Sequence, residues 1–272
     1  MTKVIPRNLI KHLEWKPGQE VAPIKDPINQ STQPLSTRGN QDNLTYDFLE
    51  GDFGKQILDE YNQLVQNEYQ NVSDLQKLSF ENNVVKGSNP FAFVLLNKVL
   101  QDHGKWVARP ADLERALEKE SINLKGTYGD SGLVLRSNTD PNQYLAQNLI
   151  AQIKQREELQ SPLMIPLEGL DLKYDSSSPN DLSFQLTNST ELIYAPQLDK
   201  TNHEKKFNNG DKQGLPILDE NGSRTLYSNE GEGLCRLYRY WDLGLDARGR
   251  SLSSSNSSGR VIVCAEGTSP KK

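Results

Sequence analysis

The chain has 272 residues, a formal net charge of −5, a mean hydropathy of −0.70 and 7% aromatic residues. Its length is sufficient to bury a sizeable core in one large or two small domains, and its aromatic content and periodic apolar segments exclude a disordered chain. The negative charge argues against a general binder of nucleic acid or of acidic membranes.

The first 45 residues predict an extended arm or early strands, because they are rich in Pro, Gln and Asn with only short apolar pieces. We expect one domain over residues 46–272. Its N-terminal part predicts helices, which are marked by apolar residues at helical spacing and by a capping residue or proline at the start. The expected helices span 52–70, 73–78, 91–103, 110–117 and 142–157. In the first of them, Asp52 is the expected cap.

The C-terminal half is predicted to be rich in strands, since short alternating apolar runs follow Pro162. The expected strands span 163–167, 170–174, 182–186, 192–194, 215–218 and 224–227. The third and fourth of these strands predict one hairpin. Asn221-Gly222 predicts a second hairpin between the last two strands. Residues 202–212 are expected to form a charged loop.

Motifs for catalysis or metal binding do not occur in the sequence. The three histidines are isolated, and there is no phosphate-binding loop, Gly-x-Ser-x-Gly or zinc-protease motif. Two turns rich in Asn and Asp, 209–211 and 219–222, lack the spacing of a calcium loop. We therefore expect no catalytic residue, no metal and no cofactor. No apolar run has the length of a membrane span and residues 1–15 lack the layout of a signal peptide, so we also expect no membrane insertion.

Residues 233–264 differ in composition from the rest of the chain. Lys, Glu, Gln and Met account for 57 of the 272 residues, but for none of the 32 in this window, which nevertheless holds five of the twelve arginines. Against these arginines stand only Asp242 and Asp246, so the local charge leaves room for an anionic ligand. Recurrent leucines and the β-branched run 260–264 predict a framework of fixed apolar positions. The leucines are Leu234, Leu237, Leu243, Leu245 and Leu252.

Three causes compete for this bias. Tyr, Ser, Gly, Asp and Arg are typical of binding loops, where aromatic rings give rigid contact area and small residues give adaptable hydrogen bonds. Codons that end in C or T exclude Lys, Glu, Gln, Met and Trp, and Trp241 alone breaks that rule here. A surface loop rich in Ser and Gly is sufficient to explain residues 253–259.

The window resembles the variable region of proteins diversified by retroelements, particularly the archaeal type. There a reverse transcriptase misreads template adenines, so that AAC and AAT codons become almost any codon ending in C or T. The similarity lies in the missing Lys, Glu, Gln and Met and in the ending SNSSGRVIVC at 255–264. Residues 106–117, WVARPADLERAL, are also similar to a segment of the formylglycine-generating-enzyme group, which shares the C-type lectin-like fold.

The resemblance implies a C-type lectin-like α+β fold, with short mixed or antiparallel sheets, several helices and a variable region at about 233–264. It implies a receptor-like or adhesin-like protein, not an enzyme, that binds a protein or a surface glycan; display on a cell or on a virion is compatible with the sequence, which does not decide the location. The sequence names neither the ligand nor the oligomeric state. Trp241 falls outside the codon set and is assigned to the fixed scaffold, although an exposed Trp would make a good anchor for a ligand. The expected contact residues are polar, aromatic or small, namely Cys235, Tyr238, Arg239, Tyr240, Asp242, Gly244, Asp246, Ala247, Arg248, Gly249, Arg250, Ser251, Ser253 and Ser254.

Two other functions remain open. An oxidase like the formylglycine-generating enzymes would need a close pair of C-terminal cysteines, whereas Cys235 and Cys264 are 29 positions apart. A fixed-specificity adhesive tip protein would have the same fold without variation between gene copies. The two cysteines can form a disulfide if their strands pair, but both are reachable from the variable codon, which favours free thiols.

Overall fold

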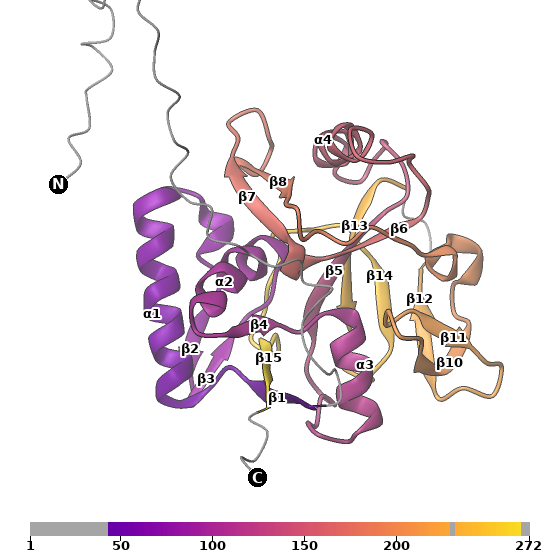
Figure 1. The fold of residues 1–272 in the computed structure, drawn as a ribbon, viewed down its shortest axis with the longest axis horizontal. Coiled ribbons are helices and arrows are strands. Elements are labelled where there is room, and N and C mark those ends of the chain that lie inside the picture. Colours follow the sequence, from indigo (N-terminus) through magenta and orange to yellow (C-terminus); the bar gives the residue numbers. More distant parts are fainter. Residues whose placement is uncertain (1–42, 229–231, 268–272) are drawn as a thin grey trace, which may run out of the picture. The chain divides into compact units, whose positions relative to one another are not determined.

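The computed structural model describes residues 43–228 and 232–267. These residues form a mixed α+β arrangement of four α-helices and several β-sheets, the largest of which is a curled sheet of eight strands (Figure 1). The predicted α+β class is therefore confirmed. The predicted arm, 1–45, lies outside the described residues except for its last three, where strand β1 begins. Within the described residues, no helix has both the length and the apolar character that a membrane crossing requires.

The helices form where local signals predict them. They are α1 (Gly51–Glu68), α2 (Pro90–Asp102), α3 (Pro110–Glu118) and α4 (Gln143–Ile153). Asn89 caps α2, because its side chain accepts a hydrogen bond of 2.8 Å from the Ala92 N–H, and Pro90 takes the first helical position. The expected cap of α1 is wrong, since Glu50 occupies that position without a side-chain bond and Asp52 lies in the first turn. The helix expected at 73–78 is a short 3₁₀ turn, Ser73–Leu75.

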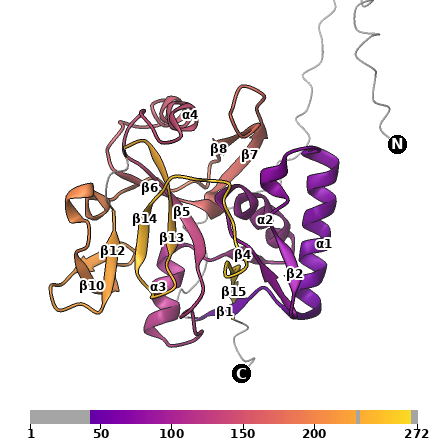
Figure 2. The ribbon, with the colours of Figure 1, turned by 180° about the vertical axis from the view of Figure 1, so that it is seen from behind.

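The eight-stranded sheet has the order β11-β10-β12-β14-β13-β5-β6-β9. Its strands are β5 (Gly129–Leu135), β6 (Leu163–Pro166), β9 (Ile193–Tyr194), β10 (Lys206–Gly210), β11 (Pro216–Leu218), β12 (Arg224–Tyr227), β13 (Leu234–Arg239) and β14 (Leu245–Gly249). Strand β13 pairs antiparallel with both β5 and β14, and β14 pairs parallel with β12. The window with the unusual composition therefore supplies two central strands of this sheet (Figure 2).

Three smaller sheets complete the described part of the chain. A three-stranded sheet joins β1 (Leu44–Phe48), β15 (Ile262–Glu266) and β4 (Lys105–Val107), with β15 in the middle. Two hairpins are formed by β2 (Ser79–Glu81) with β3 (Val84–Lys86), and by β7 (Leu170–Tyr174) with β8 (Leu182–Leu186).

Both expected hairpins are wrong, although their strands are found close to the predicted places. Strand β8 pairs with β7, and β9 pairs with β6. Strands β11 and β12 do not pair with each other, because β10 lies between them and pairs with both. Gly222 allows β10 to approach this closely, because it has no side chain. In any other residue the Cβ atom would lie 2.4 Å from the Phe207 nitrogen of β10 and would clash with it. The charged loop expected at 202–212 thus contains a strand.

The core consists of three clusters that lie on different faces of the sheets. The largest joins α1, α2 and α4 to one face of β5 and to β7 and β8. A second fills the inside of the curled sheet around Phe207 and Leu237, and a third packs α3 against Trp106 and Ile262. The expected apolar framework is confirmed for Leu234, Leu237, Leu245, Leu252 and the run 261–263, which are buried, whereas Leu243 is half-buried.

Candidate ligand-binding face

Strand β13 sends its side chains alternately to two faces of the eight-stranded sheet, as the pleat of a strand requires. The odd positions point into the curl of the sheet, where Leu237 joins the second core cluster and Cys235 is fully buried. The even positions point to the opposite face. There Tyr238 and, just beyond the strand, Tyr240 are half-buried, so their rings reach the surface.

Five aromatic side chains form one continuous group, which we call the aromatic face: Tyr128, Tyr227, Tyr238, Tyr240 and Trp241. The ring centroids of successive neighbours lie 6.0 Å (Tyr128 to Tyr238), 6.2 Å (Tyr238 to Tyr240), 5.8 Å (Tyr240 to Tyr227) and 5.8 Å (Tyr240 to Trp241) apart. The pairs are T-shaped or tilted, which is a favourable geometry for aromatic rings. Because each ring is held by another, the face is preorganised for contact with a ligand.

Polar groups border the aromatic face. Arg248 lies over the Tyr227 ring at 4.7 Å from its centroid and forms an ion pair of 3.0 Å with Asp246. Burial, followed by the Asp246 carboxylate, raises the pKa of the Tyr238 hydroxyl, and burial with Asp242 raises the pKa of Tyr227. These two phenols are therefore neutral at physiological pH and can donate hydrogen bonds to a ligand.

Hydrogen bonds hold the turn that carries Trp241, residues 240–244. Tyr240 N–H donates to the Gly244 carbonyl, and the Asp242 carboxylate accepts from the Gly244 N–H at 2.9 Å. Leu243 has a φ of 69°, a left-handed conformation that is uncommon for a leucine. Its carbonyl accepts hydrogen bonds from both Arg224 and Arg239, at 3.0 and 3.1 Å, and these bonds hold the turn in place.

The two clamping arginines share one buried acid. Arg224 makes a bidentate pair with the Glu114 carboxylate of α3 at 2.7 and 2.8 Å, and Arg239 also donates to the same carboxylate. Burial favours the neutral acid, but the two arginines outweigh it and lower the pKa of Glu114. Burial lowers the pKa of Arg239 to about 10, a shift that Glu114 opposes. We call this cluster the Glu114 clamp; it links α3 to the turn under the face.

A second buried ion pair fixes the loop that follows β14. Arg236 of β13 forms a bidentate pair with Asp130 of β5, at 2.8 and 2.6 Å. The remaining Arg236 N–H groups donate to the carbonyls of Ser251, Ser254 and Ser88 at 3.2, 2.8 and 3.1 Å. Although burial opposes the charge, Asp130 raises the pKa of Arg236. The serine-rich loop is therefore anchored to the sheet by one guanidinium.

The structure divides the fourteen expected contact residues into three groups. Buried positions, which offer no side-chain surface to a ligand, are Cys235, Arg239, Gly244, Asp246 and Ala247. Half-buried positions at the surface are Tyr238, Tyr240, Asp242, Arg248, Gly249 and Ser253, and exposed positions are Arg250, Ser251 and Ser254. Strand alternation accounts for Cys235, Arg239 and Ala247, which are odd positions. Asp246 is buried in its ion pair with Arg248, and Gly244 lies within the hydrogen-bonded turn.

Sequence reasoning missed three members of the aromatic face. Trp241 was expected in the fixed scaffold, but 56% of its surface is exposed. Tyr227 ends β12 and Tyr128 precedes β5, so both lie outside the window and join the face only through strand pairing. No local signal marks either tyrosine. Alternation along 234–240 places Tyr238 and Tyr240 on one face, but Leu234 and Arg236 of the same face are buried.

The positive charge of the window is largely compensated in the folded chain. Arg236, Arg239 and Arg248 each form an ion pair with a carboxylate, and two of those carboxylates, on Asp130 and Glu114, come from outside the window. The local excess of arginine therefore gives no reason to expect an anionic ligand.

The remaining reactive groups lie apart from the aromatic face. Cys235 and Cys264 are free and buried, and they belong to the eight-stranded and three-stranded sheets respectively. Burial raises the pKa of both thiols. Within residues 43–228 and 232–267, no group of three or more His, Cys, Asp or Glu side chains is placed to hold a metal ion. No family model matches the chain, and no curated protein or solved structure is significantly similar to it.

Proposed function

We propose that the chain is a ligand-binding protein, receptor-like or adhesin-like, whose aromatic face contacts a protein or a surface glycan. The observation that carries the proposal is the preorganised group of four tyrosines and one tryptophan, three of which belong to the biased window. Tyr, Trp and Arg are the residues that most often dominate binding energy at interfaces. We further propose a C-type lectin-like scaffold in which a retroelement diversifies the exposed positions of the window.

The division between buried and surface positions supports this proposal. A diversified protein must vary its contact residues without losing stability, so variable and structural positions have to be separated. Here the structural positions are held by the apolar framework, the Glu114 clamp and the Arg236–Asp130 pair, while the contact positions bring their side chains to the surface beside them. A fixed-specificity adhesive protein is the second candidate and would use the same face. The cysteines do not favour an oxidase, because they lie in separate sheets.

Sequencing the 3′ end of the gene in a population of its source tests diversification directly. We expect substitutions at codons ending in C or T within about residues 235–258, concentrated at surface positions such as Tyr238, Tyr240 and Arg250. Cys235 and Ala247 should stay unchanged, because any larger side chain at these fully buried sites would overpack the core. An invariant window would favour fixed specificity. Variation concentrated at the buried positions would contradict the proposed division.

Replacing Trp241 with alanine should weaken ligand binding at least thirtyfold, about 2 kcal/mol, because an exposed Trp beside packed tyrosines is a strong anchor. The labelled chain is applied to protein and glycan arrays, and affinities are measured on the spots that the unchanged protein binds. Tyr174→Ala is the matched control, since Tyr174 is similarly exposed, at 53% against 56%, but lies on β7. An equal loss in both variants, or full binding by Trp241→Ala, would refute the assignment of the face.

A further inference from the structure

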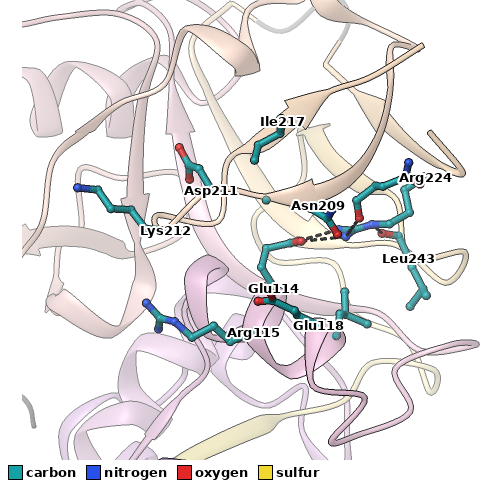
Figure 3. Close-up of a pocket in the computed structure, with 12 residues that line it drawn as sticks. Glu114, Arg115, Glu118, Asn209, Asp211, Lys212, Ile217, Arg224 and Leu243 are labelled. Atoms are coloured by element: carbon teal, nitrogen blue, oxygen red, sulfur yellow. Dashed lines mark hydrogen bonds and ion pairs between the residues drawn. The ribbon is translucent and has the colours of Figure 1, made fainter. Parts of the chain in front are cut away.

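A cavity of about 620 Å³ lies between α3 and the β10–β11 hairpin (Figure 3). This volume falls in the range of small-molecule sites, roughly 300–1,000 Å³. The cavity is separate from the aromatic face, none of whose five rings lines it. The two sites meet only at the turn 240–244, where Leu243 lines the cavity and Trp241 belongs to the face.

The Glu114 clamp forms the floor of this cavity. One Glu114 oxygen accepts from Arg224 and Arg239, and the other accepts from Arg224 at 2.8 Å. Arg224 also donates hydrogen bonds to the carbonyls of Asn208 and Leu243, at 2.9 and 3.0 Å. Of the clamp, Glu114 and Arg224 line the cavity and their charges pair with each other, whereas Arg239 is only 2% exposed and is not part of the lining.

The walls carry charges of both signs in equal number. Three acidic side chains (Glu114, Glu118 and Asp211) and three basic ones (Arg115, Lys212 and Arg224) line the cavity, so its lining has no net charge. Figure 3 shows Arg115 and Lys212 on one side of Glu114, with Arg224 and Leu243 on the other. The exposed Asn209 amide adds both a donor and an acceptor.

Apolar and polar surface share the lining about equally. Leu117, Ile217 and Leu243 offer short patches between the polar groups, and 55% of the Ile217 surface is exposed. Most pockets for drug-sized ligands are lined mainly by apolar side chains, so an apolar ligand does not match this one. A hydroxyl group does match, because it donates and accepts hydrogen bonds without bringing charge.

From this balance we infer that the cavity is a second binding site, for a neutral, hydroxyl-rich ligand of the size of a monosaccharide or disaccharide. The sugar hydroxyls would pair with Asn209, Asp211, Glu118 and Lys212, and the C–H faces of the sugar would pack on Ile217 and Leu117. The site would act independently of the aromatic face, so the inference does not rest on the function proposed for that face.

Saturation-transfer NMR on the full chain tests this inference. The neutral probes are maltose, lactose and N,N′-diacetylchitobiose, and the charged probes are glucose 6-phosphate and glucosamine. We expect transfer to at least one neutral probe. The double variant Asn209→Ala/Glu118→Ala should lower the affinity for that probe about tenfold, since it removes two hydrogen-bonding groups from exposed positions.

Two control variants test whether the saccharide binds in this cavity. Glu220→Ala, at an exposed turn position outside the lining, and Trp241→Ala, on the aromatic face, should both leave saccharide binding unchanged. The inference is overturned if no neutral probe receives transfer, if a charged probe binds more tightly than every neutral one, or if the double variant binds as well as the unchanged chain. If Trp241→Ala alone reduces saccharide binding, the saccharide binds at the aromatic face and not in the cavity.

Discussion

Arg236→Ala should lower the free energy of unfolding by about 3–5 kcal/mol, the usual cost of removing one partner of a buried ion pair. The variant leaves the Asp130 carboxylate buried and without its bidentate partner, and it also removes the donor to the carbonyls of Ser251 and Ser254. Denaturant unfolding of the two proteins measures the difference. The effect is large although Arg236 lies in a window where neighbouring side chains are expected to vary.

Arg250→Ala is the matched control, because Arg250 is an exposed arginine of the same window whose interactions are screened by water, so its replacement should change stability by less than about 1 kcal/mol. The pair itself is tested by adding Asp130→Ala. The double variant should lose less stability than the sum of the single variants, since no carboxylate is then left unpaired. A strictly additive result would show that Arg236 acts through packing alone.

Glu114→Gln is expected to destabilise the fold by about 3 kcal/mol or more, because it leaves two buried guanidinium groups without their shared carboxylate. The change should also release the turn 240–244, whose Leu243 carbonyl is held by the same two arginines. Thermal or denaturant unfolding gives the stability. The tryptophan emission spectrum, after subtraction of the spectrum of a Trp241→Phe partner that retains Trp15 and Trp106, reports the surroundings of Trp241.

Glu118→Gln provides the comparison for this variant. Glu118 lies one turn further along α3 and is exposed. The free energy of unfolding of the Glu118→Gln protein should therefore match that of the unchanged chain within about 0.5 kcal/mol. A Glu114→Gln protein as stable as Glu118→Gln would show that the clamp contributes little, and that the left-handed turn is maintained by its own backbone hydrogen bonds.

Local signals were enough to predict the helices but not the sheet. Pro90 and Pro110 start their helices as expected, because capping and first-turn preferences depend on adjacent residues. Strand pairing depends on contacts between distant segments. The Asn221-Gly222 dipeptide therefore misled the hairpin prediction, since Gly222 packs against Phe207 of a strand that the charged sequence at 202–212 conceals.

The sequence predicts which segment contributes to the candidate face, but not which of its side chains reach the surface. Composition identified residues 233–264, yet it could not tell that Arg236 and Arg239 are buried ions and that Trp241 is exposed. That distinction depends on the register of β13 between β5 and β14, including the irregularity on either side of Leu237. It also depends on partners such as Asp130, more than a hundred positions earlier in the chain.

The pairing of β1 with β15 has a practical consequence for engineering this protein. The two strands run antiparallel, with Leu44 opposite Glu266, and the Gly267 N–H donates to the Asn43 carbonyl at 2.6 Å. The first and last described residues therefore emerge next to each other (Figure 1). We expect that residues 43–267 can be inserted as a cassette into a loop of a carrier protein, or closed by a short linker and reopened within the β7–β8 turn, where Ser176 and Ser177 are exposed.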